Sequence, residues 1–150
     1  MLSDISGWIE KVEMLNSQTD ETILFKCREV WQCFFGLNVG REQNGDPTSF
    51  LRPVLVFQRF GPHIFWGVPL STKTPLGSMH HHLFWHDNTQ YSALVTQLRA
   101  LDSRRLQRRL YTLDNATFGA IQLRLGRILH CVNKIGPLEK GVLGWRKPNV

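Results

Sequence analysis

The sequence predicts an α+β fold, in which a small antiparallel barrel or curled sheet carries attached helices. Short apolar segments follow one another along the middle of the chain and are separated by turn residues, while long helical patterns occur near its two ends. Consecutive strands favour antiparallel pairing over alternating β-α-β units. The length of 150 residues favours one globular domain with an interior large enough to fold without disulfides.

Residues 4–16 predict the first helix, with Ser3 or Asp4 as its N-cap. Apolar residues recur on one face at helical spacing, namely Ile5, Trp8, Ile9, Val12 and Leu15. This face can dock on the rest of the domain or on a partner, and the pattern fits both.

Residues 26–35 predict the first strand, because Trp31, Cys33 and Phe35 alternate onto one face. A polar loop that contains several glycines then runs as far as Phe50.

Two further strands, 51–60 and 63–70, are separated by Gly61-Pro62, which predicts a β-hairpin. The second of them is apolar at nearly every residue, so we expect it to be buried on both faces.

Arg52 begins the first strand of this hairpin, and Ser71-Thr72 follows the second. Antiparallel pairing brings these two ends to the same rim of the sheet. A rigidly held guanidinium beside a hydroxyl is suited to binding a phosphate. The alternative is an ordinary ion pair between Arg52 and a carboxylate such as Glu42.

The second half of the chain predicts strands at 80–86 and 92–98, after a turn at 71–79. Asp102 is suited to cap a short basic helix over 103–110, with Leu106 and Leu110 facing inward.

A last helix begins at Asp114 or Asn115 and has a long apolar stripe. The stripe consists of Phe118, Ile121, Leu125, Ile128, Leu129 and Val132. The tail from residue 133 carries glycine, proline and lysine and supports no prediction of structure.

The net charge of +6 is unevenly distributed along the chain. Residues 98–150 hold eleven Lys/Arg and three Asp/Glu, whereas residues 1–97 hold seven and nine. This asymmetry is typical of a face that binds a polyanion, and a solvated basic helix would produce it equally well. We see no targeting signal and no apolar run close to the ~18 residues of a membrane span, so the default expectation is a soluble cytoplasmic protein.

The spacing of the cysteines and histidines indicates neither disulfides nor a metal site. Cys27, Cys33 and Cys131 are an odd set on a strand and a helix, which favours buried small hydrophobes over disulfides. His80, His81 and His82 point alternately to opposite faces of a strand and cannot all converge on one ion, so we predict no metal site. His86 remains a possible acid or base near neutral pH.

Four motifs in this order resemble the MazF/PemK family of toxins from bacterial toxin–antitoxin systems. They are Gly-x-Glu-Gln at residues 40–43, Arg-Pro-Val at 52–54, an apolar strand ending in a hydroxyl pair at 71–72, and Gln-x-Arg-x-x-Asp-x-x-Arg-Leu at 97–106. The resemblance covers roughly residues 26–130. It divides the single domain, 1–150, into an N-terminal helical extension (1–24), a toxin-like barrel (26–132) and a tail (133–150).

The resemblance implies an SH3-like barrel, usually a homodimer, that is a metal-independent and cofactor-free endoribonuclease. The expected substrate is single-stranded RNA, commonly mRNA, cut at short sequences to leave a 2′,3′-cyclic phosphate and a 5′-hydroxyl. The expected partner is an antitoxin protein, which is complementary to a basic toxin if it carries an acidic segment.

Site residues follow from the matched motifs. The resemblance implies Arg52, Ser71 and Thr72 as catalytic residues. It implies RNA-binding roles for Glu42, Gln43, Gln97, Arg99 and Arg105. Two departures are visible, since many members have threonine where Ser71 stands and the loop from Gln43 to Arg52 is longer than in compact members.

The mechanism expected from chemistry leaves one role open. The pKa of a free arginine side chain, above about 12, makes Arg52 a poor base, so its role is to stabilise negative charge on the phosphate. The general base is either this arginine, as the family implies, or His86 or Glu42, as ordinary acid–base chemistry prefers. A non-catalytic nucleic-acid- or protein-binding barrel is the main alternative function, and a topoisomerase inhibitor of related fold is a further one.

Overall fold

The computed structural model describes residues 2–19, 22–73 and 81–130. It has two α-helices, seven strands and two short 3-10 turns within these residues. The helices are α1 (Leu2–Ser17) and α2 (Asn115–Leu129). The strands are β1 (Glu29–Phe34), β2 (Leu51–Phe60), β3 (Ile64–Ser71), β4 (His82–His86), β5 (Thr89–Ala93), β6 (Arg99–Asp102) and β7 (Leu106–Thr112).

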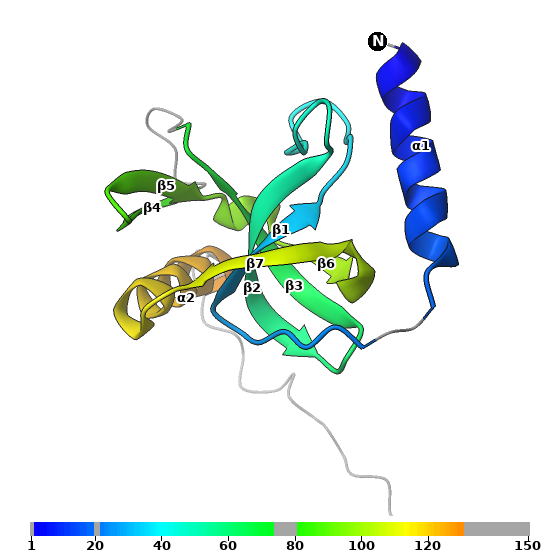
Figure 1. The fold of residues 1–150 in the computed structure, drawn as a ribbon. Coiled ribbons are helices and arrows are strands. Elements are labelled where there is room, and N and C mark those ends of the chain that lie inside the picture. Colours follow the sequence, from blue (N-terminus) through cyan, green and yellow to red (C-terminus); the bar gives the residue numbers. More distant parts are fainter. Residues whose placement is uncertain (1, 20–21, 74–80, 131–150) are drawn as a thin grey trace, which may run out of the picture.

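All strand pairs are antiparallel, in the order β4-β5-β3-β2-β1-β7, with β6 also paired to β3. The N-terminal half of β3 pairs with β6, and its last two residues, Leu70 and Ser71, pair with β5. Because one strand has different partners along its length, the sheet curls, as Figure 1 shows. The α+β class and the antiparallel curled sheet are therefore confirmed, whereas the SH3-like description and the single-domain boundaries stay predictions.

Two buried clusters lie on opposite faces of β2. Leu55 belongs to the cluster that includes Phe118 and Ile121 of α2, while its neighbours Val54 and Val56 belong to the other. Alternation along a strand explains this division. The start of β2 is consequently anchored from both sides, and this is the end that carries Arg52.

The helix predicted at 4–16, the strand at 26–35 and the 51–70 hairpin are confirmed, with shifts of a few residues at their ends. The strand predicted at 80–86 is confirmed from His82, whereas residue 80 and most of the turn predicted at 71–79 lie outside the described residues. Asp114 is the N-cap of α2, because its carboxylate accepts the Thr117 N–H at 2.8 Å. Burial of β3 on both faces is confirmed only for its second half, since Ile64 and Trp66 are partly exposed.

The strand predicted at 92–98 is wrong. β5 ends at Ala93, a 3-10 turn follows at Val95–Gln97, and β6 begins at Arg99. Ala93, Leu94 and Val95 are all buried, because this turn packs between β3 and α2. A buried turn and a buried strand present the same apolar run in a sequence.

The basic helix predicted at 103–110 is also wrong. Asp102 accepts the Arg104 N–H, but it caps only a 3-10 turn at Ser103–Arg105, after which β7 begins. Leu106 and Leu110 pack in different clusters, because the pairing of β7 with β1 shifts register twice. The four-residue spacing of these two leucines suggested one helical face, but in the structure it belongs to a bulged strand.

The two helices lie on opposite sides of the sheet (Figure 1). Helix α1 packs on the domain through residues such as Trp8 and Leu15, which decides the question that its sequence left open. Among the described residues, neither helix has the length and hydropathy needed to cross a bilayer.

Candidate functional site

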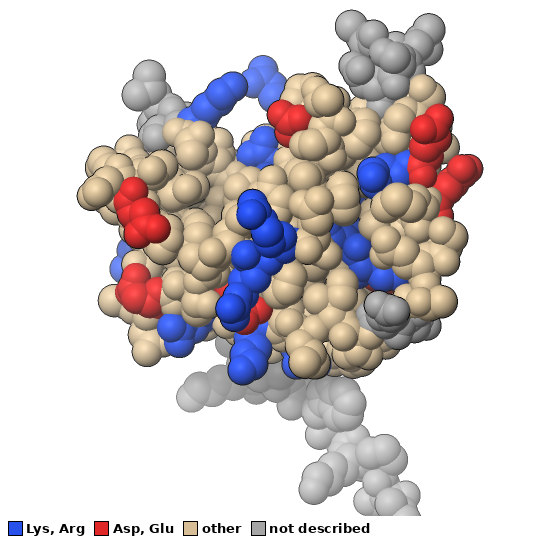
Figure 2. All heavy atoms as spheres, viewed as in Figure 1, with Lys and Arg blue, Asp and Glu red and all other residues tan. Residues whose placement is uncertain are grey.

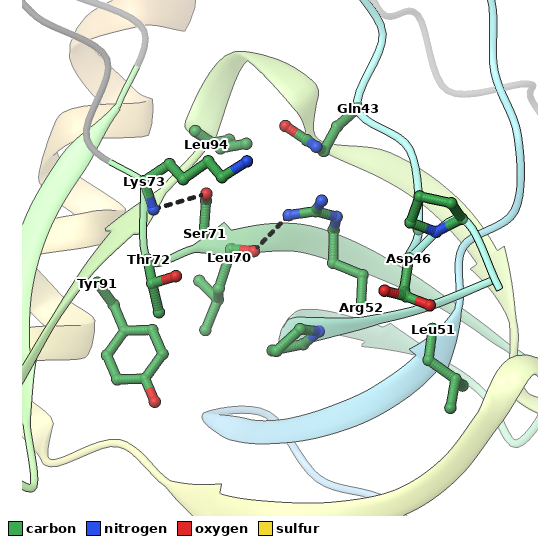
Figure 3. Close-up of a pocket in the computed structure, with 13 residues that line it drawn as sticks. Gln43, Asp46, Leu51, Arg52, Leu70, Ser71, Thr72, Lys73, Tyr91 and Leu94 are labelled. Atoms are coloured by element: carbon green, nitrogen blue, oxygen red, sulfur yellow. Dashed lines mark hydrogen bonds between the residues drawn. The ribbon is translucent and has the colours of Figure 1, made fainter. Parts of the chain in front are cut away.

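An open pocket of about 450 Å³ lies at the rim where β2 begins and β3 ends. Three parts of the chain form its walls: the loop between β1 and β2, the two strand ends, and the segment around β5. The polar residues that line it are Gln43, Asp46, Arg52, Ser71, Thr72, Lys73 and Tyr91 (Figure 3).

Arg52 is half-buried and is held by two carbonyl groups. Its Nη1 donates to the Leu70 carbonyl at 2.9 Å, and its Nε donates to the Asn44 carbonyl. Burial lowers the pKa of the Arg52 guanidinium, but an arginine in a protein keeps its charge at neutral pH. The first contact fixes the guanidinium to β3, and the second fixes it to the loop.

The alternative ion pair between Arg52 and Glu42 is absent from the described part of the chain. Glu42 is exposed and accepts the Val39 N–H at 3.3 Å. Since Arg52 Nη2 also has no partner among the described residues, the charge of Arg52 is available to an anion in the pocket.

Ser71 faces Arg52 across the pocket, as the hairpin pairing predicted. Its Oγ accepts the Lys73 N–H at 3.1 Å, so its hydroxyl hydrogen can be donated to a ligand. Figure 3 shows the side-chain ends of Arg52, Ser71, Lys73 and Gln43 turned toward one common space. Two cations and a hydroxyl around a hollow of this size form a site suited to a phosphodiester.

Thr72 lines the same pocket and is more exposed than Ser71. The two hydroxyl residues therefore both border the space, and the structure singles out Ser71 only through its hydrogen bond with the following turn.

Gln97 joins the loop between β1 and β2 to the rest of the domain, and it does not line the pocket. Its Oε1 accepts the Gln43 N–H at 3.3 Å, and its Nε2 donates to the Arg41 carbonyl at 3.5 Å. Gln43 itself lines the pocket. Of the five residues expected to bind RNA, Gln43 alone is among the pocket residues.

Arg99 and Arg105 lie behind the loop. Arg99 donates to Asn38 Oδ1 at 3.0 Å and stacks over the Phe35 ring. Arg105 donates to the Phe34 carbonyl at 3.0 Å, and burial, followed by the charge of Arg99, lowers its pKa. Both guanidiniums thus contact the base of the loop, and neither lines the pocket.

Neither alternative base reaches the pocket. The His86 ring stacks on Tyr111 with centroids 3.7 Å apart, and its Nε2 lies 3.3 Å from the Asp87 carboxylate. Glu42 is likewise not a lining residue.

Sequence reasoning missed Asp46 and Lys73. Asp46 Oδ1 accepts the N–H groups of Ser49 and Thr48 and the Ser49 hydroxyl, and these bonds lower its pKa. Lys73 directly follows the hydroxyl pair, and its position two residues past the end of β3 was the available signal.

Within the described residues, no three His, Cys, Asp or Glu side chains are grouped so as to hold a metal ion. His80 and Cys131 lie outside those residues. Cys33 is buried, and burial raises the pKa of its thiol to about 12, which fits the expected role of a small apolar residue.

The face seen in Figure 2 gathers lysine and arginine near its middle, in the region where Figure 1 draws β7, while most acidic residues lie toward the edges. β7 contributes Arg108 and Arg109, which are exposed. Arg109 is partly neutralised, since its Nη1 lies 3.2 Å from the buried Glu29 carboxylate.

Fold and pocket together define a small basic α+β protein with a pocket lined by Arg52, Ser71 and Lys73 at the open end of a β-hairpin. The chain belongs to the family of PemK-like, MazF-like toxins of type II toxin–antitoxin systems, whose family model matches residues 26–129. No curated protein matches the sequence.

Several solved structures have a similar fold. MazF from Deinococcus radiodurans aligns with a TM-score of 0.58 and 21% identity over 71% of this chain and 97% of its own. One chain of a MazE–MazF structure from the same organism aligns with a TM-score of 0.52 and 18% identity, over 71% of this chain and 96% of its own. A protein described as an endoribonuclease from a mycobacterial species aligns at 0.53 and 16%, over 73% and 95%. At these identities the likeness concerns the fold.

Proposed function

We propose that this protein is the toxin of a toxin–antitoxin pair and cleaves single-stranded RNA, commonly mRNA, at short sequences. The observation that carries the proposal is the convergence of Arg52, Ser71 and Lys73 on one open pocket. Family membership supports it, as does the description of one structural relative as an endoribonuclease.

The proposed reaction is an attack of the ribose 2′-oxygen on the adjacent phosphorus. A general base accepts the proton of the 2′-hydroxyl, the new P–O2′ bond forms, the P–O5′ bond breaks, and a general acid gives a proton to the leaving 5′-oxygen. The products are a 2′,3′-cyclic phosphate and a 5′-hydroxyl. Atoms balance without a metal ion or cofactor, and the positive charge for the transition state comes from side chains.

Arg52 stabilises the negative charge that develops on the phosphate oxygens. It is suited to this role because β3 and the loop hold it through two carbonyls, so little reorganisation is needed during the reaction. Ser71 donates its hydroxyl hydrogen to a phosphate oxygen, and Lys73 adds a second positive charge. Thr72 is a second hydroxyl at the same rim.

The loop contributes to recognition. Gln43 presents an amide that can pair with a base edge, and Gln97 holds the backbone of Gln43 in place. Glu42, Arg99 and Arg105 act from the surface and base of the loop, by contacting flanking nucleotides or by supporting the loop.

The proposed partners are RNA, a second copy of this chain, and an antitoxin. A MazE–MazF structure is among the similar folds, which supports an antitoxin partner. Net charge of +6 favours an acidic antitoxin segment. We place the whole reaction in the cytoplasm, where mRNA and the antitoxin are synthesised.

Arg52→Ala tests the proposal. We expect it to lower the rate of RNA cleavage about 10²- to 10³-fold, because one preorganised charge donor is lost. The assay is fragmentation of a long single-stranded RNA in EDTA, with mass spectrometry of the fragment ends. Arg59→Ala is the matched control, since Arg59 lies at the other end of β2, where its guanidinium donates to the Gly61 carbonyl and lies over the Phe25 ring, and neither of these residues lines the pocket.

Cleavage by Arg52→Ala at the wild-type rate would remove Arg52 from the mechanism. RNA binding by the wild-type protein without any fragments would instead support the non-catalytic binding module.

A further inference from the structure

Helix α1 lies outside the family-matched segment, residues 26–129, yet it packs against the loop that lines the pocket. We call residues 36–50 the pocket loop.

The pocket loop is closed at its base by backbone hydrogen bonds. The N–H groups of Phe35 and Gly36 both donate to the Phe50 carbonyl, at 2.8 and 3.1 Å. Inside the loop, the Gly45 N–H donates to the Gly36 carbonyl at 2.8 Å. Gly36 and Phe50, the two ends of the loop, are thus joined directly.

Trp8 of α1 sits on both of these ends. Its ring centroid lies 5.4 Å from that of Phe50. A Cβ atom added to Gly36 would lie only 2.1 Å from a carbon of the Trp8 ring, so the indole occupies the space that a side chain at residue 36 would need. The Trp8 side chain therefore packs against both ends of the pocket loop.

The closure depends on unusual backbone conformations. Gly36 has φ of +80°, which glycine adopts freely, but Phe50 has φ of 61°, which is costly for an aromatic residue. Such conformations persist where the surrounding structure holds them in place. Packing of Trp8 on Phe50 supplies that support from outside the barrel.

Trp8 is itself held in position by residues next to the base of the loop. The Arg105 guanidinium lies 5.6 Å from the Trp8 ring and donates to the Phe34 carbonyl, next to the loop base. Lys11, one turn further along α1, lies over the Phe34 ring, and Leu15 is buried. Helix α1 therefore packs beside the loop base through Trp8, Lys11 and Leu15. Ile5 and Ile9, at the edge of the same apolar face, are about half exposed.

The loop in turn reaches the reactive groups. The carbonyl of Asn44 accepts the Arg52 Nε, and Gln43 and Asp46 form one wall of the pocket. A continuous series of contacts therefore runs from Trp8 through Phe50 and Gly36 to the loop wall and Arg52.

We propose that α1 holds the pocket loop in its working conformation, with Trp8 as a positioning residue for the phosphate site. The effect on RNA rests on the proposed function, whereas the effect on the loop does not. Because the Leu70 carbonyl still holds Arg52 when the loop loosens, loss of Trp8 should weaken substrate binding more than the chemical step.

The first test is amide hydrogen exchange of the full-length protein, comparing Trp8→Ala, Trp8→Phe and the control Ile9→Ala with wild type. We expect the amides of Gln43 and Gly45 to exchange about tenfold or more faster in Trp8→Ala, because both are hydrogen-bonded in the closed loop. Amides of the β2–β3 ladder should keep wild-type protection. Trp8→Phe should restore most of the loop protection, and Ile9→Ala should not alter it.

The second test is RNA cleavage by the same four proteins. Trp8→Ala should raise KM about tenfold and lower kcat by much less, with partial recovery in Trp8→Phe. Unchanged loop exchange in Trp8→Ala would overturn the proposal. If Trp8→Ala loses the whole fold, Trp8→Leu decides, because it keeps an apolar side chain but removes the ring that contacts Phe50 and Gly36. Loop exchange faster than wild type with an intact β2–β3 ladder supports the proposal, and wild-type loop exchange in Trp8→Leu overturns it. Faster loop exchange in a protein that never cuts RNA would leave the loop inference standing and refute the nuclease.

Discussion

The two sides of the pocket are built in different ways. Arg52 and Ser71 stand on β2 and β3, where ladder hydrogen bonds and buried residues on both faces fix the backbone. Gln43 and Asp46 stand on a loop held by turn hydrogen bonds, by Gln97 and by Trp8. The strand side is therefore suited to charge stabilisation, which needs fixed geometry, and the loop side to recognition, which tolerates local adjustment.

The largest effect in this comparison is expected on the strand side, from Ser71→Ala. Loss of a hydrogen bond to a charged phosphate costs roughly 1.5–3 kcal/mol, which corresponds to about a 10- to 100-fold slower cleavage. Thr72→Ala is the matched control and should cost less, because Thr72 is more exposed. Single-turnover cleavage of one labelled RNA measures both, and a greater loss in Thr72→Ala would assign the catalytic hydroxyl to Thr72.

An intermediate effect is expected at the loop base, from Gly36→Ala. The substitution combines a left-handed backbone, which costs an alanine roughly 1–2 kcal/mol, with a collision against the Trp8 ring that costs a further ~1–3 kcal/mol. Gly40→Ala has the same backbone cost at φ of +57° but meets nothing within 4 Å. Urea denaturation compares the two.

The difference between these glycine variants isolates the packing of α1 on the loop. If both variants lose the same free energy of unfolding, then α1 can move away from Gly36 at little cost in free energy. The pocket loop would then depend less on the helix than the contacts indicate.

The smallest effect is expected from Asp46→Asn on the loop side. Hydrogen bonds lower the folded-state pKa of Asp46, so its carboxylate stabilises the fold above the unfolded-state pKa of about 3.9, and this contribution is lost as the pH falls through the lower folded-state value. Asp46→Asn should therefore lower the melting temperature slightly at pH 7, with the difference from wild type shrinking toward pH 3. Glu42→Gln, which neutralises an exposed carboxylate of the same loop with one long hydrogen bond, is the control for the change in net charge.

The strand side of the pocket could be predicted from the sequence because a tight hairpin relates its two ends by simple counting from Gly61-Pro62. The observed pairing of Val54 with Pro69 continues toward Arg52 and Ser71, which explains why the motif residues meet. Asp46 and Lys73 could not be found in this way, since loop geometry decides which side chains turn toward the pocket.

The apolar spacing gave wrong predictions at 92–98 and 103–110, where the chain turns or bulges. Residues 93–95 are buried in a turn, and the leucines at 106 and 110 reach different clusters because β7 bulges twice against β1. The same four-residue spacing therefore fitted a helix in the sequence and a strand in the structure.

The sequence by itself determined the curled antiparallel class, the hairpin, both α-helices and the meeting of Arg52 with Ser71, because each follows from local periodicity or from turn chemistry. Only the tertiary structure decided that the Arg105 guanidinium contacts Trp8 and that Gln97 hydrogen-bonds the pocket loop. It also decided that α1 packs against Gly36 and Phe50. Those contacts join residues far apart in the chain, and their geometry depends on how the sheet curls.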